Sequence, residues 1–370
     1  MNDMKITPWE VSGNIDYNKI LKDFGIKEID SKLMKRLEKF VGDNVFLRRG
    51  IFFAHRDLNF ILDQYEKGNE FYLYTGRGPS GNTHIGHLIP WIFTKNLQEK
   101  FNVKLIFQLT DDEKYLFNQK LSIDDVKKYT EENILDIIAI GFDHKKTEIY
   151  TDLNNAGTLY PQAVRVAKHI TYSTAKAVFG FENDSNVGKI FFTSMQAVPA
   201  FIESVKAGKN IPCLIPHAVD QDAHFRVARD VLPKLGYYKP ASIQAKFIPG
   251  LGKGGKMSAS DPDSAIFTTD SEKDIEKKIK KAFTGGRETI EEQKEKGGQP
   301  EICPIYQYFY FLFEENDDEL KKRFDDCKSG KLMCGECKKN LIPRVQKFIA
   351  EHQKKREQAK KIINKFLAKD

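Results

Sequence analysis

The fold is decided by residues 71–87, which read FYLYTGRGPSGNTHIGH. The aromatic and apolar start of this stretch predicts a buried strand, and the residues that follow it, 88–101, predict a helix. Between the two lies a glycine-rich loop, whose backbone N–H groups and following helix N-terminus can face a phosphate. His84 and His87 are one helical turn apart and reach the same side, although capping or partly buried imidazoles are the plainer alternative. The stretch therefore predicts a phosphate-binding turn at the end of a strand.

The same alternation of strands and helices continues along the chain. Further apolar runs predict strands at residues 103–107, 147–150, 211–215 and 242–248, and helical patterns separate them. Ser122 with Asp125, and Ser271 with Asp274, predict the capped starts of two helices. Parallel strands joined by helices form a doubly wound α/β sheet, whose ligands bind beyond the carboxyl ends of the strands. The strand pattern stops after Thr269, and residues 302–367 look all-helical. We expect an N-terminal extension at 1–70 with helical stretches around residues 31–40 and near residues 55–66, a Rossmann-like catalytic domain at 71–285 and a helical domain at 286–370.

Composition narrows the class of protein. The chain has 370 residues, of which 40% are hydrophobic and 12% aromatic, so it can bury a large core and is not a disordered chain. It contains no apolar run long enough for a membrane helix, and its N-terminus does not resemble a secretion signal. The five cysteines are an odd number and do not suggest a disulfide framework. We therefore expect a cytoplasmic protein with no membrane partner.

A second glycine-rich motif follows the last predicted strand. Residues 252–260 read GKGGKMSAS, with three glycines, Lys256 and two hydroxyl side chains. A mobile loop of this kind can close over a polyphosphate and neutralise the charge on a departing pyrophosphate. Alone, it is equally typical of a flexible basic surface loop. About 170 residues separate the two motifs, yet both follow strands, so we expect them at one edge of the sheet.

The two motifs resemble the HIGH and KMSKS signatures of class I aminoacyl-tRNA synthetases. Within that class, the chain resembles the tryptophanyl-tRNA synthetases of the eukaryotic and archaeal type, in the segments at residues 47–57, 71–90, 108–116, 213–226 and 256–262. The resemblance begins at Pro8 and Trp9 and covers nearly the whole chain. One departure is Ala259, where many members of the class carry a second lysine, and it leaves Lys256 as the main cation of the loop.

The resemblance implies the Rossmann-like catalytic domain of a class I synthetase that acts as a tryptophan–tRNA ligase. Tryptophan reacts with ATP to give tryptophanyl-adenylate and pyrophosphate, and the tryptophan then passes to tRNA(Trp). The implied tryptophan-binding residues are Tyr74 and Gln108 for the indole N–H, Glu113, Gln196 and Gln221 for the amino group, and Phe225 against the ring. For Gln108 and Gln196, hydrogen bonding within the core is the more common role. A buried acceptor that faces the indole N–H can reject phenylalanine by about 10⁴ to 10⁵.

The resemblance also implies how ATP is held. The implied ATP-binding residues are Gly76, Arg77, Gly78, His84, Gly86, His87, Lys256, Met257 and Ser258. Of these we interpret Arg77, His84 and His87 as contacts to the phosphates, and Lys256 with Ser258 as catalytic contacts to the α-phosphate and the leaving pyrophosphate. Mg²⁺ would bind through the ATP phosphates, so no metal site of the protein's own is predicted. Asp220 contacts ribose or substrate, or it is an acidic helix cap.

The C-terminal fifty residues carry most of the positive charge. Residues 321–370 hold 16 Lys and Arg against 6 Asp and Glu, whereas the whole chain has a net charge of +7. Helical spacing of the apolar residues leaves a basic row towards solvent, formed by Arg344, Lys347, Lys354, Lys355, Arg356, Lys360 and Lys361. Such a surface suits an anticodon loop. The simpler alternative is a lysine-rich helix whose charges contact only solvent. The resemblance further implies a homodimer with tRNA crossing between subunits.

Three of the cysteines lie close together near the C-terminus. Cys327, Cys334 and Cys337 have the spacing C-x6-C-x2-C with no suitably spaced fourth cysteine, and although His352 could complete a zinc site, we expect ordinary thiols.

Three other functions are weighed against that of a tryptophan–tRNA ligase. They are those of a tyrosine-specific relative, a small nucleotidylyltransferase and a catalytically silent paralogue. The segments at 110–114 and 220–225 resemble the tryptophan-specific enzymes more than the tyrosine-specific ones. The second motif and the helical C-terminal domain argue against a nucleotidylyltransferase, and the intact His84, His87 and Lys256 argue against a silent paralogue.

Overall fold

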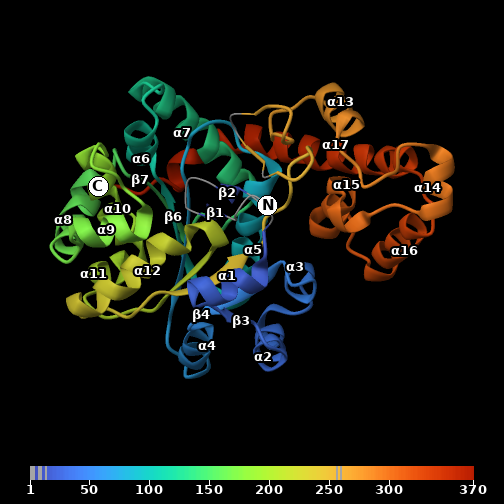
Figure 1. The fold of residues 1–370 in the computed structure, drawn as a ribbon. Coiled ribbons are helices and arrows are strands. Elements are labelled where there is room, and N and C mark those ends of the chain that lie inside the picture. The colour runs from blue at the N-terminus through green and yellow to red at the C-terminus, as the bar shows by residue number, and fades with distance from the viewer. Residues whose placement is uncertain (1–4, 7–10, 13–14, 256, 259–260) are drawn as a thin grey trace.

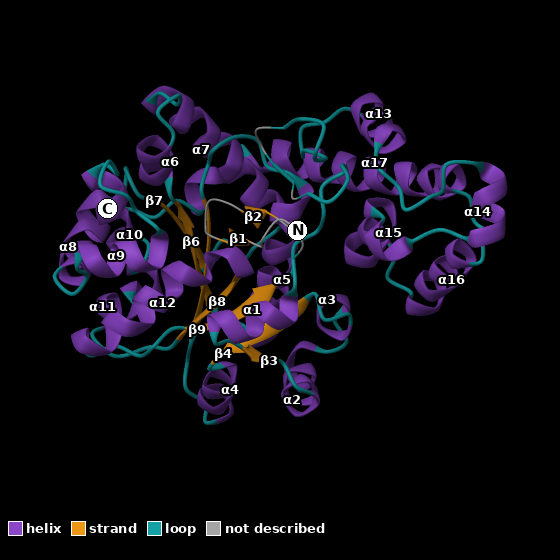
Figure 2. Ribbon diagram, in the orientation of Figure 1, coloured by secondary structure: helices purple, strands orange, loops and turns teal. Residues whose placement is uncertain are grey.

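The computed structural model describes residues 5–6, 11–12, 15–255, 257–258 and 261–370. A seven-stranded sheet runs through the middle of the molecule (Figure 2), in the order β3–β4–β9–β8–β5–β6–β7, and β1 and β2 form a separate antiparallel pair. The strands are β1 (Lys5–Ile6), β2 (Val11–Ser12), β3 (Lys27–Glu28), β4 (Phe52–Arg56), β5 (Tyr72–Arg77), β6 (Lys104–Leu109), β7 (Thr147–Thr151), β8 (Cys213–Ala218) and β9 (Ala241–Ala245).

The predicted parallel sheet is confirmed for the five strands β5 to β9. They pair in parallel, with β5 at the centre between β8 and β6. The sheet is larger than the sequence indicates, because β4 pairs antiparallel with β9 and β3 pairs antiparallel with β4. The helical stretch expected to begin near His55 was therefore placed too early, since His55 lies in β4 and the helix starts at Leu58.

Helices cover both faces of the sheet and form the C-terminal end of the molecule (Figure 1). Before β8 they are α1 (Tyr17–Phe24), α2 (Ser31–Val41), α3 (Val45–Arg48), α4 (Leu58–Glu66), α5 (Ile85–Phe101), α6 (Asp111–Phe117), α7 (Ile123–Ala139), α8 (Ala156–Ala167), α9 (Tyr172–Phe179), α10 (Val187–Met195) and α11 (Ile202–Ala207). After β8 they are α12 (Asp222–Val231), α13 (Glu272–Lys281), α14 (Ile290–Lys296), α15 (Pro304–Tyr308), α16 (Asp317–Lys328) and α17 (Cys334–Ala359). Among the described residues, no helix has both the length and the apolar character that crossing a membrane requires.

Two large apolar cores, one on each face, hold the sheet, and a smaller third cluster surrounds Phe53 of β4. Side chains alternate between the faces along a strand, so Leu73 of β5 enters the core under α2, α5, α7 and α17, whereas Tyr72 and Tyr74 enter the core under α8 to α12. Several helix starts are fixed locally by capping boxes. Ser122 and Asp125 bond each other's backbone N–H at 3.1 and 3.0 Å, which confirms the predicted start of α7.

The chain end returns from the helical region to the sheet. In Figure 1, α17 runs from the C-terminal helices back to α7, and the C-terminus lies beside α8. Ala368 N donates to Ile149 O of β7 at 2.9 Å, and the Asp370 carboxylate accepts from two backbone N–H groups of α8 at 2.7 and 2.6 Å. The C-terminal helices and the sheet are therefore tied by backbone hydrogen bonds as well as by the core.

One residue of the predicted basic row is not at the surface. The side chain of Arg356 is buried, and its Nη1 donates to Asp136 Oδ1 of α7 at 2.6 Å. His352 Nε2 also lies 2.9 Å from Asp136 Oδ1. The prediction that Arg356 faces solvent was therefore wrong, because a buried acid on another helix pairs with it. The other six basic residues of the row are exposed.

Candidate functional site

A cavity of about 560 Å³ opens where β5, β8 and β9 end. It is lined by the loop after β5, the first turn of α5, the start of α6, the β8–α12 segment and residues 245–248 and 257–258. Twelve of the predicted site residues line it, namely Gly76, Arg77, Gly78, His84, Gly86, His87, Glu113, Gln196, Gln221, Phe225, Met257 and Ser258. The two glycine-rich motifs therefore meet at one site, as their positions after strands predict. Lys256 lies outside the described residues.

Gly86 brings the two motifs into contact. A Cβ atom at this position would lie 3.2 Å from Met257 Sδ and 3.1 Å from His84 Nδ1, so a larger residue would require these side chains to shift by a few tenths of an ångström. Two backbone hydrogen bonds hold the first motif against residues 266–268. Ile85 N donates to Ile266 O at 3.0 Å, and Thr268 N donates to Thr83 O at 2.9 Å. The chain that follows the second motif is thus bonded to the first.

The two histidines form a stacked pair. Their ring centroids lie 3.5 Å apart at an interplanar angle of 24°. The backbone N–H of His84 donates to Nδ1 of His87 at 3.1 Å, so His87 caps the N-terminus of α5 while both residues line the cavity. The capping role that we weighed as an alternative is therefore real for His87, and it fixes the ring at the cavity wall.

The end of β5 and the loop after it contain glycines for a reason that the sequence does not show. A Cβ atom on Gly76 would lie 2.9 Å from the Gln108 carbonyl oxygen, and one on Gly78 would lie 2.0 Å from Lys114 Cε. Gly76 thus requires glycine to pack against the backbone of β6, whereas at Gly78 the close atom belongs to the flexible end of the Lys114 side chain, which could move. Arg77 lies between them, and its Nε donates to Asn133 Oδ1 at 3.1 Å. Burial lowers the pKa of Arg77 to about 10, so the guanidinium stays charged at neutral pH.

A buried polar network lies behind the cavity. The Tyr74 hydroxyl donates to Gln108 Oε1 at 2.5 Å, and Gln196 Nε2 donates to the Tyr74 oxygen at 2.5 Å and to Gln108 Oε1 at 3.1 Å. The Phe225 ring meets Tyr74 edge to face, with centroids 5.8 Å apart. Tyr74 and Gln108 do not line the cavity themselves, but Gln196 connects them to it. These four predicted residues are thus brought together.

Asp152, which sequence reasoning missed, orients this network. It directly follows β7, and its carboxylate accepts two hydrogen bonds from Gln108 Nε2, at 2.8 and 3.0 Å. The Gln108 amide is therefore held with its oxygen towards Tyr74. Burial, and then the nearby Asp112 carboxylate, raise the pKa of Asp152 well above its usual value. An acid directly after a strand end was the available signal, since the other site residues follow strands too.

The cavity lining also includes acidic and imidazole groups. Glu113 accepts from Thr110 Oγ1 at 2.7 Å and from Lys114 Nζ at 2.7 Å, so its carboxylate is held in place at the rim of the cavity. Asp220 lines the cavity next to Gln221, and Gln221, not Asp220, occupies the N-cap position of α12. His217, which the sequence reasoning also missed, packs its ring 4.8 Å from that of Phe225, and burial lowers its pKa.

Comparison with known proteins identifies the family. The family model described as tRNA synthetases class I (W and Y) matches residues 66–350. The chain belongs to this family of class I tRNA synthetases. Among curated relatives, the tryptophan–tRNA ligase of Pyrococcus abyssi is 50% identical over 370 residues, covering 99% of this chain and 94% of the relative. That of Thermococcus kodakarensis is 49% identical with the same coverage of both chains.

Solved structures agree with the family assignment. The tryptophanyl-tRNA synthetase of Plasmodium falciparum superposes with a TM-score of 0.88 at 43% identity, over 95% of this chain and 97% of the other. The enzyme of Encephalitozoon cuniculi, solved with tryptophan bound, gives a TM-score of 0.86 at 38% identity, over 96% and 98%. The predicted class I synthetase fold, with a parallel sheet and a helical C-terminal region, is thereby confirmed.

Proposed function

We propose that this class I synthetase is a tryptophan–tRNA ligase, which forms tryptophanyl-adenylate from tryptophan and ATP and then charges tRNA(Trp). The observation that carries the proposal is the junction of the two motifs, where Gly86 leaves Met257 in contact with the first turn of α5 at the wall of a single cavity. The curated relatives at about half identity are tryptophan–tRNA ligases. The amide and hydroxyl network behind the cavity supports a substrate with one N–H on a flat ring.

The first step needs positioning and charge stabilisation more than acid–base chemistry. A carboxylate is already ionised at neutral pH, so it can attack the α-phosphorus without a general base. Arg77 and the histidine pair lie where the phosphates would approach the helix N-terminus, which favours anions. Ser258 and Lys256 would act at the α-phosphate as pyrophosphate leaves. Glu113, Gln196 and Gln221 would hold the ammonium group, which keeps the carboxylate free.

Mg²⁺ fits this site as a companion of ATP. In the described part of the chain, no three His, Cys, Asp or Glu side chains come together around a point suited to one metal ion. Asp220 at the cavity wall is a carboxylate of the kind that Mg²⁺ accepts in small number beside phosphate oxygens. When bound, the ion would offset part of the triphosphate charge.

The remaining parts of the proposal concern tRNA and assembly. Six exposed basic residues on and after α17 form a surface suited to the anticodon loop, within the proposed helical domain at 286–370. The proposed catalytic domain at 71–285 and the extension at 1–70 would then bind the acceptor end and ATP. We further propose a cytoplasmic homodimer. Light scattering should give twice the chain mass of 42.5 kDa, and a monomer would exclude the dimer.

Amino acid-dependent ATP–pyrophosphate exchange tests the proposed activity directly. Only tryptophan should support exchange when each amino acid is supplied in turn. His84→Ala should depress exchange by at least tenfold, because the imidazole at the phosphate position is lost, whereas His169→Ala, outside the cavity, should not. Exchange driven by tyrosine, or without any amino acid, would overturn the assignment.

Lys256 requires its own experiment because its role concerns charge that develops during the reaction. Lys256→Ala should slow single-turnover adenylate formation by about 10²–10³, the cost of losing one stabilising group. Tryptophan affinity should stay within about twofold, because the lysine is assigned to pyrophosphate. Lys277→Ala, an exposed lysine on α13, is the matched control. An unchanged single-turnover rate in Lys256→Ala would exclude the role.

A further inference from the structure

One buried asparagine forms hydrogen bonds to three residues that lead into the first motif. Asn133 lies in α7 and has no exposed surface. Its Oδ1 accepts from Arg77 Nε at 3.1 Å and from Thr83 Oγ1 at 3.3 Å, and its Nδ2 donates to Gly81 O at 3.0 Å. Arg77 is the last residue of β5, and the other two lie between β5 and α5. Sequence reasoning missed Asn133, because it is 50 to 56 positions away from these partners.

The hydrogen bonds of Asn133 fix which end of its amide faces Arg77. Besides Gly81 O, its Nδ2 donates to Tyr129 O of the preceding turn at 2.7 Å. An asparagine amide has two N–H donors and two lone pairs on oxygen, and the four bonds use all of them. A rotated amide would point its oxygen at two carbonyl oxygens and its NH₂ group at the Arg77 N–H. The oxygen is therefore held towards Arg77.

Arg77 keeps donors that a ligand can use. Its side chain lines the cavity assigned to ATP, whereas Asn133 does not. Asn133 accepts only from Nε, and the buried Arg77 Nη2 has no hydrogen-bond partner among the residues that the structure describes. A guanidinium is a rigid planar fork, so a bond that fixes Nε also limits where the two terminal nitrogens point. A phosphate oxygen in the cavity would satisfy such a buried donor.

Helix α7 is a fixed support for Asn133. About one turn further along it, the buried Asp136 accepts from Arg356 Nη1 of α17 at 2.6 Å and lies 2.9 Å from His352 Nε2. Arg356 also donates to Glu132 of α7. A side chain on a helix that is packed and bonded in this way can hold another group more precisely than a loop can.

We propose that Asn133 is a positioning residue, which directs the guanidinium of Arg77 towards the phosphates of ATP. The inference rests on the proposed function, because that function places ATP in the cavity. The neighbours of Arg77 in the chain, Gly76 and Gly78, carry no side chain that could restrain it, so the bond from α7 supplies a restraint that the loop cannot. Asn133 itself contacts neither substrate, and its effect passes through Arg77.

A purely structural asparagine would behave differently. If Asn133 only stabilised the loop, its removal would weaken ATP binding by the same factor whether or not Arg77 is present. If it acts through Arg77, the loss should largely disappear once the guanidinium is removed, because two groups that act as a unit give non-additive effects. The affinity for tryptophan should also stay unchanged, since Arg77 is assigned to the phosphates.

Binding of a non-hydrolysable ATP analogue to the full-length chain, measured by calorimetry, tests the inference. Asn133→Ala should weaken binding at least about fivefold, because a hydrogen bond to a charged group is lost. Alanine suits a helix interior, so α7 should still form. Asn133→Leu, which fills the volume without polar atoms, should have a similar effect. Thr130→Val is the matched control, because it removes only a bond within α7, from Thr130 Oγ1 to Val126 O at 2.8 Å, and it should leave the affinity within about twofold.

A double-mutant cycle with Arg77→Ala decides whether Asn133 acts through Arg77. Adding Asn133→Ala to Arg77→Ala should weaken analogue binding by less than about twofold more. The same loss in both backgrounds would overturn the inference, and so would wild-type affinity in a folded Asn133→Ala variant. A loss of tryptophan affinity as large as the loss of analogue affinity would also overturn it.

The binding assay separates failure of this inference from failure of the proposed function, because it needs no amino acid. A wild-type chain that binds the analogue but shows no tryptophan-dependent exchange would overturn the proposed function, and the cycle would still decide the role of Asn133. A wild-type chain that does not bind the analogue would overturn both.

Discussion

Asp152→Ala should weaken tryptophan binding although Asp152 does not line the cavity. The carboxylate is only 1% exposed and accepts two hydrogen bonds from Gln108 Nε2. Those bonds decide which end of the Gln108 amide faces Tyr74 and the proposed indole site. Without them, the amide either leaves its NH₂ group buried and unpaired or rotates so that its NH₂ faces the indole N–H. Both outcomes cost binding free energy, because a donor then lacks an acceptor.

The size of the effect follows from one unsatisfied buried group. Leaving a buried donor without a partner costs about 1–3 kcal/mol. Since about 1.4 kcal/mol corresponds to a tenfold change, the KM for tryptophan should rise roughly 5- to 150-fold. The kcat at saturating tryptophan should change far less, because Asp152 touches neither phosphate nor the reacting carboxylate in this assignment. Asp152 is thus a positioning residue that acts through Gln108.

Steady-state pyrophosphate exchange, with KM and kcat determined separately, measures this split. Asp152→Asn is the control, because its amide oxygen can still accept from Gln108, and its KM should stay within a few-fold of the wild type. Discrimination against phenylalanine should fall in Asp152→Ala and persist in Asp152→Asn. A wild-type KM in a folded Asp152→Ala variant would refute the view that the carboxylate orients Gln108.

Three further changes probe other parts of the structure. Asp152→Asn should melt at a higher temperature than the wild type at pH 8 and lose this advantage below about pH 4. The raised pKa means that ionisation of Asp152, whose usual pKa is 3.8, opposes folding as the pH rises; an equal Tm at pH 8 would contradict this. Gly86→Ala should lower exchange at least tenfold with little change in Tm, because the methyl group would meet Met257 Sδ at 3.2 Å; wild-type exchange would exclude the contact as a requirement. Arg356→Ala should cost roughly 3 kcal/mol in denaturant unfolding, because Asp136 loses a buried partner, and a loss below 1 kcal/mol would contradict it.

Local sequence patterns predicted the parallel strands β5 to β9, because each of these strands is a short apolar run that can be recognised without its neighbours. The apolar start of the 71–87 stretch and the glycines after it give the strand, the turn and the helix without reference to distant residues. Serine–aspartate capping boxes fixed two helix starts in the same way. Strand β4 carries no comparable signal. Its first four residues are all buried, so the alternation that distinguishes a strand from a short helix is missing.

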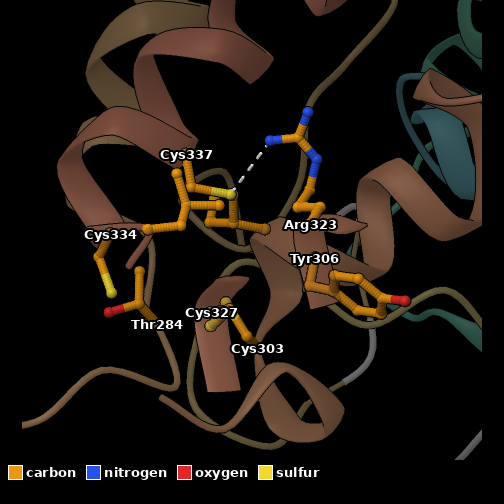
Figure 3. Close-up of a pocket in the computed structure, with 9 residues that line it drawn as sticks. Thr284, Cys303, Tyr306, Arg323, Cys327, Cys334 and Cys337 are labelled. Atoms are coloured by element: carbon orange, nitrogen blue, oxygen red, sulfur yellow. Dashed lines mark hydrogen bonds between the residues drawn. The ribbon is translucent and has the colours of Figure 1, made fainter. Parts of the chain in front are cut away.

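Contacts between distant residues account for what the sequence could not predict. Helical periodicity treats Arg356 as a surface residue because it is charged, and Asp136 and Glu132 of α7, which lie 220 and 224 positions earlier, make its burial tolerable. Cys303 lies with Cys327, Cys334 and Cys337 around one small cavity in the C-terminal helical region (Figure 3). A rule based on cysteine spacing does not find Cys303, because it is far from the other three along the chain. In both cases the residue type was informative, but the partner that decides its role came from the fold.

The glutamines of the proposed tryptophan pocket are a further case in which the sequence does not reveal the hydrogen-bond partners of a residue. Resemblance assigns Gln108 to the indole N–H and Gln196 to the amino group, as if each acted alone. In the structure, Gln196 Nε2 already donates to Tyr74 and to Gln108 Oε1, which are the two acceptors assigned to the indole. An indole N–H that bonds to Gln108 Oε1 would compete with the Gln196 NH₂ group for that oxygen, whereas a substrate ammonium would need Gln196 Oε1, the acceptor at the other end of the same amide. The two assignments therefore describe one coupled exchange of hydrogen bonds, which residue identities alone cannot reveal because it depends on the amides being about 3 Å apart.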